Sequence, residues 1–437
     1  MLDAIKQFQT AVLALEPFQK VGRITAVEDN RVAVSGLSED VVVGTLLQLG
    51  SAADSLLAEV IKLEPDQIIC APFQSVAKVH IGQMARLRSA LQVSPSTAWR
   101  GRVINAFAQP IDDKGPLAIG ESTSLTQIPN PMRRGKLGRR ITTNLNVFDT
   151  ILPIAKGQRI GLFAGSGVGK TTLLRQLAQG IEADTLVFVL IGERGRELRE
   201  FISDLDLKTR QHAIIVAATS DRSPLERRRA LSTAMTIAEK LRDQGEHVVL
   251  FADSLSRFAE AHRDIAGQVG EPVGLGGWPV STAQRLAEAV ERAGPGEGHG
   301  AITAIFSVLV QGSDMEEPLA DMVRGLLDGH VALSRDLAEA GHFPAIDVTT
   351  SVSRSLLHVS NQAELKTISQ ARKHLAVLKR GMPLIQAGLY SAGDDADLDS
   401  ALALAEPLAA FVHSGLQRGE QGKTTSMEQL MALIEPQ

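Results

Sequence analysis

A glycine-rich segment at residues 164–171 carries the clearest chemistry in this sequence. It reads Ala-Gly-Ser-Gly-Val-Gly-Lys-Thr and lies between an apolar run at 159–163 and a helical pattern at 172–181. Glycines in a strand–loop–helix setting let backbone N–H groups curl around phosphate oxygens, and the helix N-terminus adds the positive end of its dipole. We therefore predict an ATP site. Its predicted nucleotide-binding residues in this stretch are Gly165, Ser166, Gly167, Val168, Gly169, Lys170, Thr171 and Thr172.

Side chains in and beyond this segment have the types needed to hold a metal ion. The catalytic ammonium of Lys170 can contact the β- and γ-phosphates, and the hydroxyl of Thr171 can bind Mg²⁺. The second metal ligand should be an acid at the end of a buried strand, and Asp253 follows the apolar run 247–252. An aspartate in such a position is more often a helix cap when it stands alone. The glycine-rich segment upstream favours the metal ligand.

Glu193 is a candidate for activating the attacking water. It follows the apolar run 185–191, so it should lie at the carboxyl edge of a sheet, where ligands bind. A carboxylate there can accept a hydrogen bond from water and align it for attack. The alternative is that Glu193 pairs with a neighbouring arginine in a solvated loop. The residues alone leave both interpretations open.

The elements that must position these side chains form an α/β pattern over residues 150–350. Candidate strands lie at 159–163, 185–191, 213–218, 247–252 and 303–310, and helical stretches separate them. Several of the strands are almost entirely Val, Leu, Ile and Phe, which is typical of parallel strands covered on both faces. The sequence therefore predicts an α/β core with a parallel sheet.

Smaller regions flank this core on both sides. Short apolar strands at 21–27, 31–35 and 41–49 predict a small all-β domain over residues 20–91, with a closed barrel as one candidate. A leading apolar stripe over residues 2–15 predicts a helix, and the Pro- and Gly-punctuated stretch 94–130 predicts a connection between domains. Amphipathic helices are expected at 362–380, 397–411 and 427–433. We divide the chain into domains at 1–91, 92–358 and 359–437.

Composition excludes several classes of protein. The 437 residues carry 45 basic and 50 acidic side chains, so there is no basic surplus of the kind nucleic-acid binders show. The single cysteine, Cys70, excludes an intrachain disulfide and fits a reducing compartment. No stretch is apolar over the roughly 20 residues of a membrane span, and the N-terminus lacks a signal peptide. We expect a cytoplasmic protein.

Longer strings of residues carry a family resemblance. They are the stretches at 152–161, 191–197, 327–330, 340–347 and 351–354, which read LPIAKGQRIG, IGERGRE, LDGH, AGHFPAID and SVSR. Together with the glycine-rich segment they resemble hexameric ATPases related to the catalytic subunit of the rotary ATP synthase. Within that superfamily the chain is most similar to the protein-export ATPases of the bacterial flagellum and of type III secretion.

The resemblance implies a RecA-like P-loop core with an N-terminal small β-barrel and a C-terminal helical domain. It implies that Glu193 is the catalytic glutamate, that Asp253 is linked to Mg²⁺, and that Arg354 is a finger reaching the neighbouring subunit's site. Phe343 matches the position of an aromatic ring against adenine. The implied work is ATP hydrolysis by a homohexamer that energises flagellar (type III) protein export.

The implied partners are other copies of the chain, export-apparatus regulator, stalk and gate proteins, and chaperone–substrate complexes. The implied location is the cytoplasm, peripheral at the inner face of the cytoplasmic membrane. Two stretches depart from relatives, the loop containing Trp278 and the stretch beginning at Gln311. An inactive ring subunit should lack an acid at 193, and a nucleic-acid motor should carry a basic, aromatic β domain, whereas residues 20–91 hold a single aromatic, Phe73.

Overall fold

The computed structural model describes residues 20–51, 54–89, 91–123, 130–310, 314–414 and 425–435. The chain divides into two compact units, the first comprising residues 1–91 with 222–226 and 261–272, and the second the remainder. The predicted helix at 2–15 and the departure at Gln311 lie outside the described residues. The division into three domains set from the sequence stays a prediction.

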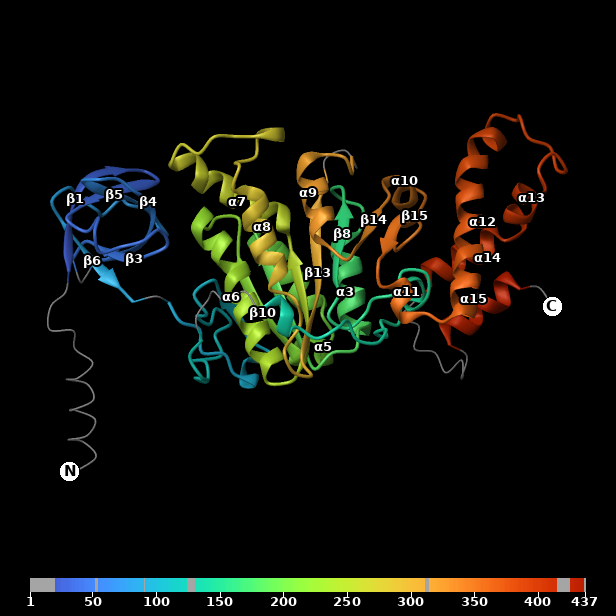
Figure 1. Ribbon diagram of the computed structural model, residues 1–437, viewed down its shortest axis with the longest axis horizontal. Helices are drawn as coiled ribbons and strands as arrows, with labels where there is room; N and C mark the ends of the chain where they lie inside the picture. The colour runs from blue at the N-terminus through green and yellow to red at the C-terminus, as the bar shows by residue number, and fades with distance from the viewer. Residues whose placement is uncertain are drawn as a thin grey trace, which may run out of the picture. The chain divides into compact units, whose positions relative to one another are not determined.

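The first unit is built on a closed β-barrel (Figure 1). Its strands follow the order β1-β2-β5-β4-β3-β6, and every pairing is antiparallel. Alternate side chains fill the interior, as Leu47 and Leu49 do on β3. The predicted small β domain is therefore confirmed as a barrel. The strands are β1 (Val21–Glu28), β2 (Arg31–Ser35), β3 (Leu46–Leu49), β4 (Leu56–Leu63), β5 (Gln67–Pro72) and β6 (Met84–Arg88).

The predicted strand at 41–49 is wrong over its first half. Only Leu46–Leu49 is a strand, and Val42 and Val43 are exposed. Gly44 has a φ of 94° and its N–H donates to the carbonyl of Val60 at 2.8 Å. A left-handed glycine held in this way forms a turn, and its geometry overrides the strand preference of the neighbouring valines.

The second unit holds a nine-stranded sheet with the order β15-β14-β8-β13-β11-β9-β10-β7, and β12 pairs with β13 beside this path. Neighbouring strands are parallel except at β14–β15 and β12–β13. All five predicted strands are confirmed within two residues. The strands are β7 (Val103–Asn105), β8 (Arg159–Ala164), β9 (Thr185–Ile191), β10 (Ala213–Ala218), β11 (His247–Asp253), β12 (Gly294–Pro295), β13 (Ala301–Leu309), β14 (Gly329–Leu333) and β15 (Ile346–Ser353).

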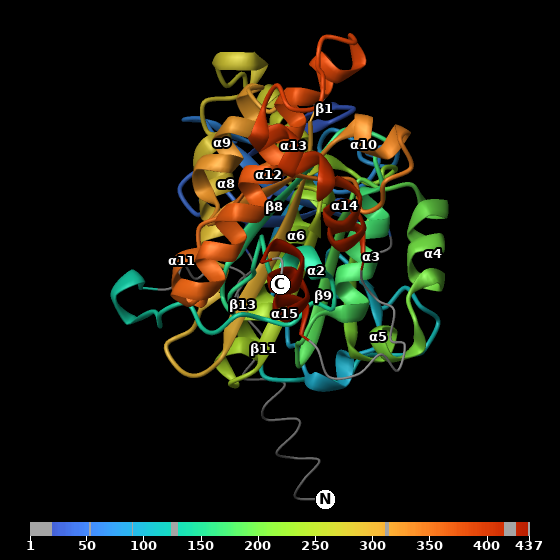
Figure 2. The same ribbon diagram turned by 90° about the vertical axis from the view of Figure 1, so that its right-hand side faces the viewer.

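Both faces of this sheet are covered by helices. On β9, Phe188 belongs to one buried cluster with α3 and α4, whereas Val189 belongs to another with α6, α8 and α9. Figure 2 shows α3 and α4 on one side of β8 and α8 and α9 on the other. The strands are apolar along their whole length because helices cover both of their faces, as expected from the sequence. The longer helices of the core are α3 (Lys170–Gly180), α4 (Gly195–Asp204), α6 (Pro224–Asp243), α7 (Leu255–Gln268), α8 (Thr282–Glu291) and α9 (Pro318–Leu326).

The stretch at 94–130 is more than the predicted connection. Its strand β7 pairs in parallel with β10 at the sheet edge, and Trp99 is buried among the core residues of this unit. The short length of β7 hid it from a pattern that requires longer apolar runs. The remaining short helices of the core are α2 (Asn146–Asp149), α5 (Leu207–His212), α10 (Arg335–Glu339) and α11 (Leu356–Val359), with 3₁₀ turns at Thr97–Trp99, Pro131–Arg133 and Leu275–Gly277.

The C-terminal part is helical, as predicted. It contains α12 (Gln362–Gln386), α13 (Ala396–Ala403), α14 (Ala405–His413) and α15 (Ser426–Ile434). The single helix expected at 397–411 is two helices, because Pro407 has no N–H to donate to the carbonyl of Ala403 and is tolerated only in a first turn. Buried side chains such as Ile368 and Leu408 pack into the same cluster as Phe188. None of the helices in the described part of the chain is long and apolar enough to cross a membrane.

Candidate active site

The glycine-rich loop joins the end of β8 to the start of α3. Gly167 and Gly169 have φ values of 79° and 90°, a region that side chains with a Cβ rarely adopt. Ala164 ends the strand and is absent from the positive-φ residues, so a side chain with a Cβ is tolerated there. Val168 is buried, which anchors the loop while Ser166 and Gly167 stay exposed. The loop thus presents open backbone in front of a helix.

The first turn of α3 suits an anion. This helix has 11 residues, begins at Lys170 and carries no acidic side chain in its first turn. Thr171 and Thr172 follow on that turn and are exposed. Arg335 of α10 reaches the loop as well, donating to the carbonyl of Ser166 at 3.4 Å. Positive charge therefore surrounds the loop on two sides.

Asp253 lies beside the loop at the same edge of the sheet. It ends β11, two strands from β8, and the residue is only 4% exposed. Its Oδ1 accepts from Lys170 Nζ at 2.5 Å and from the hydroxyl of Ser307 at 2.6 Å. Ser307 stands on β13 between the two strands, a contact that the sequence analysis did not identify. The pairing of Lys170 with Asp253 places the glycine-rich loop and the predicted second metal ligand at the same edge of the sheet.

Glu193 lies two residues beyond β9 and is half-buried. Burial and the negative charges of Asp253 and Glu197 raise the pKa of Glu193 to about 7, while the charge of Lys170 lowers it. Its immediate neighbour Arg194 instead forms an ion pair with Glu197 at 3.6 Å. A carboxyl group with a pKa near neutrality can both accept and return a proton at physiological pH.

Arg257 is a further cation at this edge that sequence reasoning missed. It belongs to α7, and a Cβ on Gly192 would meet its side chain at 3.3 Å. The negative charges of Glu193 and Asp253 contribute to a raised pKa of Arg257, after the larger effect of its 2.9 Å hydrogen bond to Glu260. The signal available in the sequence was its helical position, one turn after Asp253.

Phe343 lies against the glycine-rich loop although it is far away in sequence. A Cβ placed on Gly169 would lie 3.2 Å from Cε1 of its ring. The residue is 49% exposed, so part of its side chain contacts the loop while another part is open to a ligand. The positive φ of Gly169 and this close approach both disfavour a side chain at position 169. A flat apolar ring in this place suits the base of a nucleotide.

Arg354 lies at the opposite edge of the sheet, where β8 begins. It follows β15, and its N–H donates to the carbonyl of Asp328, whose own N–H donates to the carbonyl of Arg159. Arg159 begins β8, whereas the glycine-rich loop follows its end at Ala164, a separation of about 16 Å along the strand. The Arg354 side chain is exposed. The structure thus gathers Lys170, Thr171, Glu193, Asp253 and Phe343 at one edge and keeps Arg354 away from them.

Comparisons with known proteins agree with this geometry. Residues 144–353 match the nucleotide-binding domain of the ATP synthase alpha/beta family, and residues 360–432 match the T3SS EscN ATPase C-terminal domain. A flagellum-specific ATP synthase of Treponema pallidum is 39% identical, covering 99% of this chain and 97% of that protein. A type 3 secretion system ATPase of Pseudomonas syringae is 40% identical, covering 91% and 90%.

This chain belongs to the family of flagellar and type III protein-export ATPases. The assembled ATPase EscN of enteropathogenic E. coli is similar to it in structure, with a TM-score of 0.87 and 34% identity over 95% of this chain and all of EscN. EscN has also been solved in complex with its central stalk EscO. The resemblance stated from the motifs is therefore confirmed, and so is the fold class of this export ATPase.

Proposed function

We propose that this export ATPase works as a homohexameric ring that binds ATP at subunit interfaces and energises flagellar protein export. The observation that carries the proposal is the separation described above. One chain holds the loop, Glu193 and Asp253 at one edge of its sheet, and Arg354 at the other edge. A ring of identical copies can join these two edges at every interface, because a head-to-tail contact that closes needs only one subunit type.

The phosphates of ATP are assigned to the loop and to Lys170. Backbone N–H groups of residues 165–169 and the start of α3 would surround the phosphate oxygens. Asp253 accepts a hydrogen bond from Lys170 at 2.5 Å and compensates its charge. The ammonium is therefore held at the edge where the β- and γ-phosphates would lie. Thr172 would contribute from the same helical turn.

Thr171 and Asp253 fit a magnesium ion that arrives with the nucleotide. Both offer the oxygen donors that Mg²⁺ prefers, and Asp253 is oriented by Ser307 at 2.6 Å. No cluster of three or more His, Cys, Asp or Glu side chains that could hold a metal exists in the described part of the chain. That fits Mg²⁺, which is usually bound through one or two protein ligands plus phosphates and water. When bound, the ion would neutralise charge on the transferred phosphoryl group.

Glu193 is assigned to the attacking water and Arg354 to the neighbouring site. The Glu193 carboxylate would accept a hydrogen bond from water and align it with the γ-phosphate. The Arg354 guanidinium would stabilise the negative charge that develops in the transition state of the adjacent subunit. Arg354 suits the role in the neighbouring site because it is exposed and far from its own phosphate loop. Glu193 suits the role of aligning water because it is half-buried beside Lys170 and Asp253.

Replacing Phe343 by alanine should raise the KM for ATP about tenfold and leave kcat close to the wild-type value, because base stacking on an aromatic ring contributes about 1–3 kcal/mol and is made equally in the ground and transition states. Steady-state kinetics over a range of ATP concentrations measure both constants. Phe343→Tyr is the matched control, since it keeps the ring. An unchanged KM in Phe343→Ala would contradict the assignment of this ring to adenine.

The partners proposed for the ring are export-apparatus regulator, stalk and gate proteins and complexes of chaperones with export substrates. The EscN–EscO complex supports the stalk partner, because the EscN chain in that complex matches 95% of this chain. We place the ring in the cytoplasm, peripheral to the inner face of the cytoplasmic membrane, and assign it no nucleic acid. The absence of a basic surplus supports the last point.

Turnover should depend on assembly if the active site is shared between subunits. Specific ATPase activity of the purified protein is expected to rise with protein concentration in parallel with the ring fraction seen by light scattering. Equal activity per subunit in dilute monomers would contradict the shared site.

Loss of motility in a deletion strain, restored by the wild-type chain, tests the flagellar assignment.

A further inference from the structure

The two residues on either side of Arg354 are buried, although Arg354 itself is exposed. The hydroxyl of Ser353 donates to the carbonyl of Pro153 at 2.5 Å, and the hydroxyl oxygen of Ser355 lies 3.1 Å from the same carbonyl and 3.0 Å from the hydroxyl oxygen of Ser353. The backbone that carries Arg354 is therefore held from both sides by buried hydroxyl groups. Such an arrangement limits the directions in which an exposed side chain can leave the surface.

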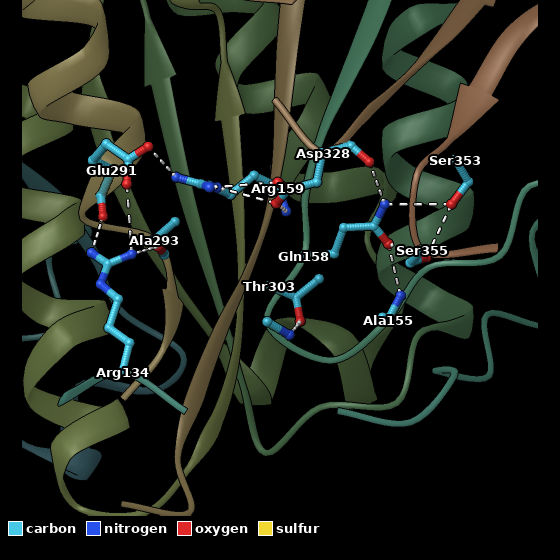
Figure 3. A network of polar contacts seen from close by, with 11 residues as sticks. Arg134, Ala155, Gln158, Arg159, Glu291, Ala293, Thr303, Asp328, Ser353 and Ser355 are labelled. Carbon is cyan, nitrogen blue, oxygen red and sulfur yellow. Dashed lines mark hydrogen bonds and ion pairs between the residues drawn. The ribbon is translucent and has the colours of Figure 1, made fainter. Parts of the chain in front are cut away.

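Gln158 completes this hydrogen-bond network (Figure 3), and the residue is fully buried. Its Nε2 donates to the carbonyl of Asp328 at 2.9 Å and lies 3.4 Å from the hydroxyl of Ser353. Its Oε1 accepts from the N–H of Ala155 and from the hydroxyl of Ser355, each at 2.8 Å. Two donors and two acceptor sites are thereby used, which is the full capacity of an amide. The orientation is unambiguous, because a carbonyl only accepts and an N–H only donates.

The carbonyl of Asp328 connects Gln158 directly to Arg354. It accepts from the Gln158 amide and also from the backbone N–H of Arg354 at 3.1 Å. The Asp328 carboxylate in turn accepts from the N–H and Nε of Arg159, at 3.0 and 3.1 Å, and Arg159 pairs with Glu291 at 2.7 Å. Asp328 is thus fixed at both its backbone and its side chain.

We propose that Gln158 is a positioning residue for Arg354, setting the direction from which the arginine enters the neighbouring subunit's ATP site. The inference rests on the proposed function, in which Arg354 acts in trans. A guanidinium that stabilises a transition state must be placed within a fraction of an ångström, and a displacement of about 1 Å can cost about 10²-fold in rate. Gln158 supplies that placement through three contacts: Asp328 and the two flanking serines.

The place of Gln158 in the fold gives this role a further consequence. Gln158 directly precedes β8, and the other end of β8 leads into the glycine-rich loop. Strand β8 therefore connects the phosphate loop of a subunit's own site with Gln158, which positions Arg354 for the neighbouring site. Arg159 joins this end of the sheet to Glu291 of α8, and Arg134 contacts the same glutamate (Figure 3).

Gln158→Met keeps the length of the side chain and removes all its hydrogen bonds. We expect kcat to fall about tenfold or more and the KM for ATP to change less than about twofold, because the finger acts only in the transition state. Ser355→Ala, which removes one hydroxyl, should give a smaller fall of the same kind. Thr233→Val is the control: it removes a fully buried 2.6 Å bond to the Ala106 carbonyl, far along the sheet from Arg354, and should leave kcat unchanged.

A double-mutant cycle separates positioning from general destabilisation. In an Arg354→Ala background, Gln158→Met should lower kcat no further, since the group it positions is already gone. A full additional fall would overturn the proposal. If Gln158→Met proves insoluble, the same cycle with Ser355→Ala gives the answer, because that variant deletes only one atom from the network.

Mixed rings give the sharpest test. Subunits with Gln158→Met keep their own Glu193, and subunits with Glu193→Gln keep a well-placed finger, so mixing the two should yield more activity than either alone. Arg354→Ala mixed with Glu193→Gln is the reference pair. If the reference pair regains activity and the Gln158→Met pair does not, the positioning role is wrong. If the reference pair also fails, the finger in trans is wrong, and with it the proposed shared site.

Discussion

Replacing Glu193 by glutamine should lower steady-state phosphate release at least about 10²-fold while leaving ATP binding nearly unchanged, because the amide cannot accept a proton from the attacking water. The pKa of Glu193 is raised to about 7 by burial and by the nearby carboxylates. The carboxyl is therefore matched to taking and returning a proton near neutral pH. Glutamine keeps the size and removes the charge, so the phosphate loop should still bind nucleotide.

Phosphate release and nucleotide binding must be measured on the same preparation. Titration with a fluorescent ATP analogue gives the dissociation constant, and a coupled assay gives turnover. Glu200→Gln is the matched control, since Glu200 stands on α4, is exposed and pairs with Arg196 at 3.4 Å. It should behave like the wild type. Near-normal turnover in Glu193→Gln would refute its role in activating water.

Replacing Arg354 by alanine should lower kcat about 10³-fold or more in assembled rings, as expected for the loss of an arginine finger. ATP binding to the same chain should be unaffected, because Arg354 and the loop lie at opposite edges of the sheet. Steady-state kinetics at a protein concentration that saturates assembly measure the loss. Light scattering on the same sample shows whether the ring persists.

Arg354→Lys is the informative companion variant. Lysine keeps the positive charge but not the planar fork of donors, so its activity should fall between the wild type and Arg354→Ala. A lysine variant as active as the wild type would indicate that charge alone suffices. An alanine variant that still assembles and turns over normally would remove Arg354 from the reaction.

The residues at the phosphate edge were predictable because local patterns report them. A glycine-rich loop between a strand and a helix is a contiguous motif, and Glu193 and Asp253 each follow an apolar run. Parallel strands bring their carboxyl ends to one edge, so the pattern of each strand was enough to group these residues. The contacts of Ser307 and Arg257 were not predictable, since neither residue type is distinctive at its position.

Elsewhere local patterns misled. The pattern around Val42 and Val43 predicted a strand, but the left-handed conformation of Gly44 places a turn there. Strand β7 was missed because it is too short for its apolar residues to form a recognisable run. Pro407 interrupts a stretch whose apolar spacing predicted one continuous helix. At Gly44 and at Pro407 a backbone requirement at one residue outweighed the preferences of its neighbours.

The sequence by itself determined the nucleotide loop, the acids that follow two buried strands, and the kind of fold that brings them together. Only the tertiary structure decided where Arg354 lies relative to them. The reason is that β15 pairs antiparallel with β14, which runs parallel to β8, so the end of β15 lies level with the beginnings of β14 and β8. Strand direction and the buried amide of Gln158 depend on partners far apart in the chain, which no local pattern records.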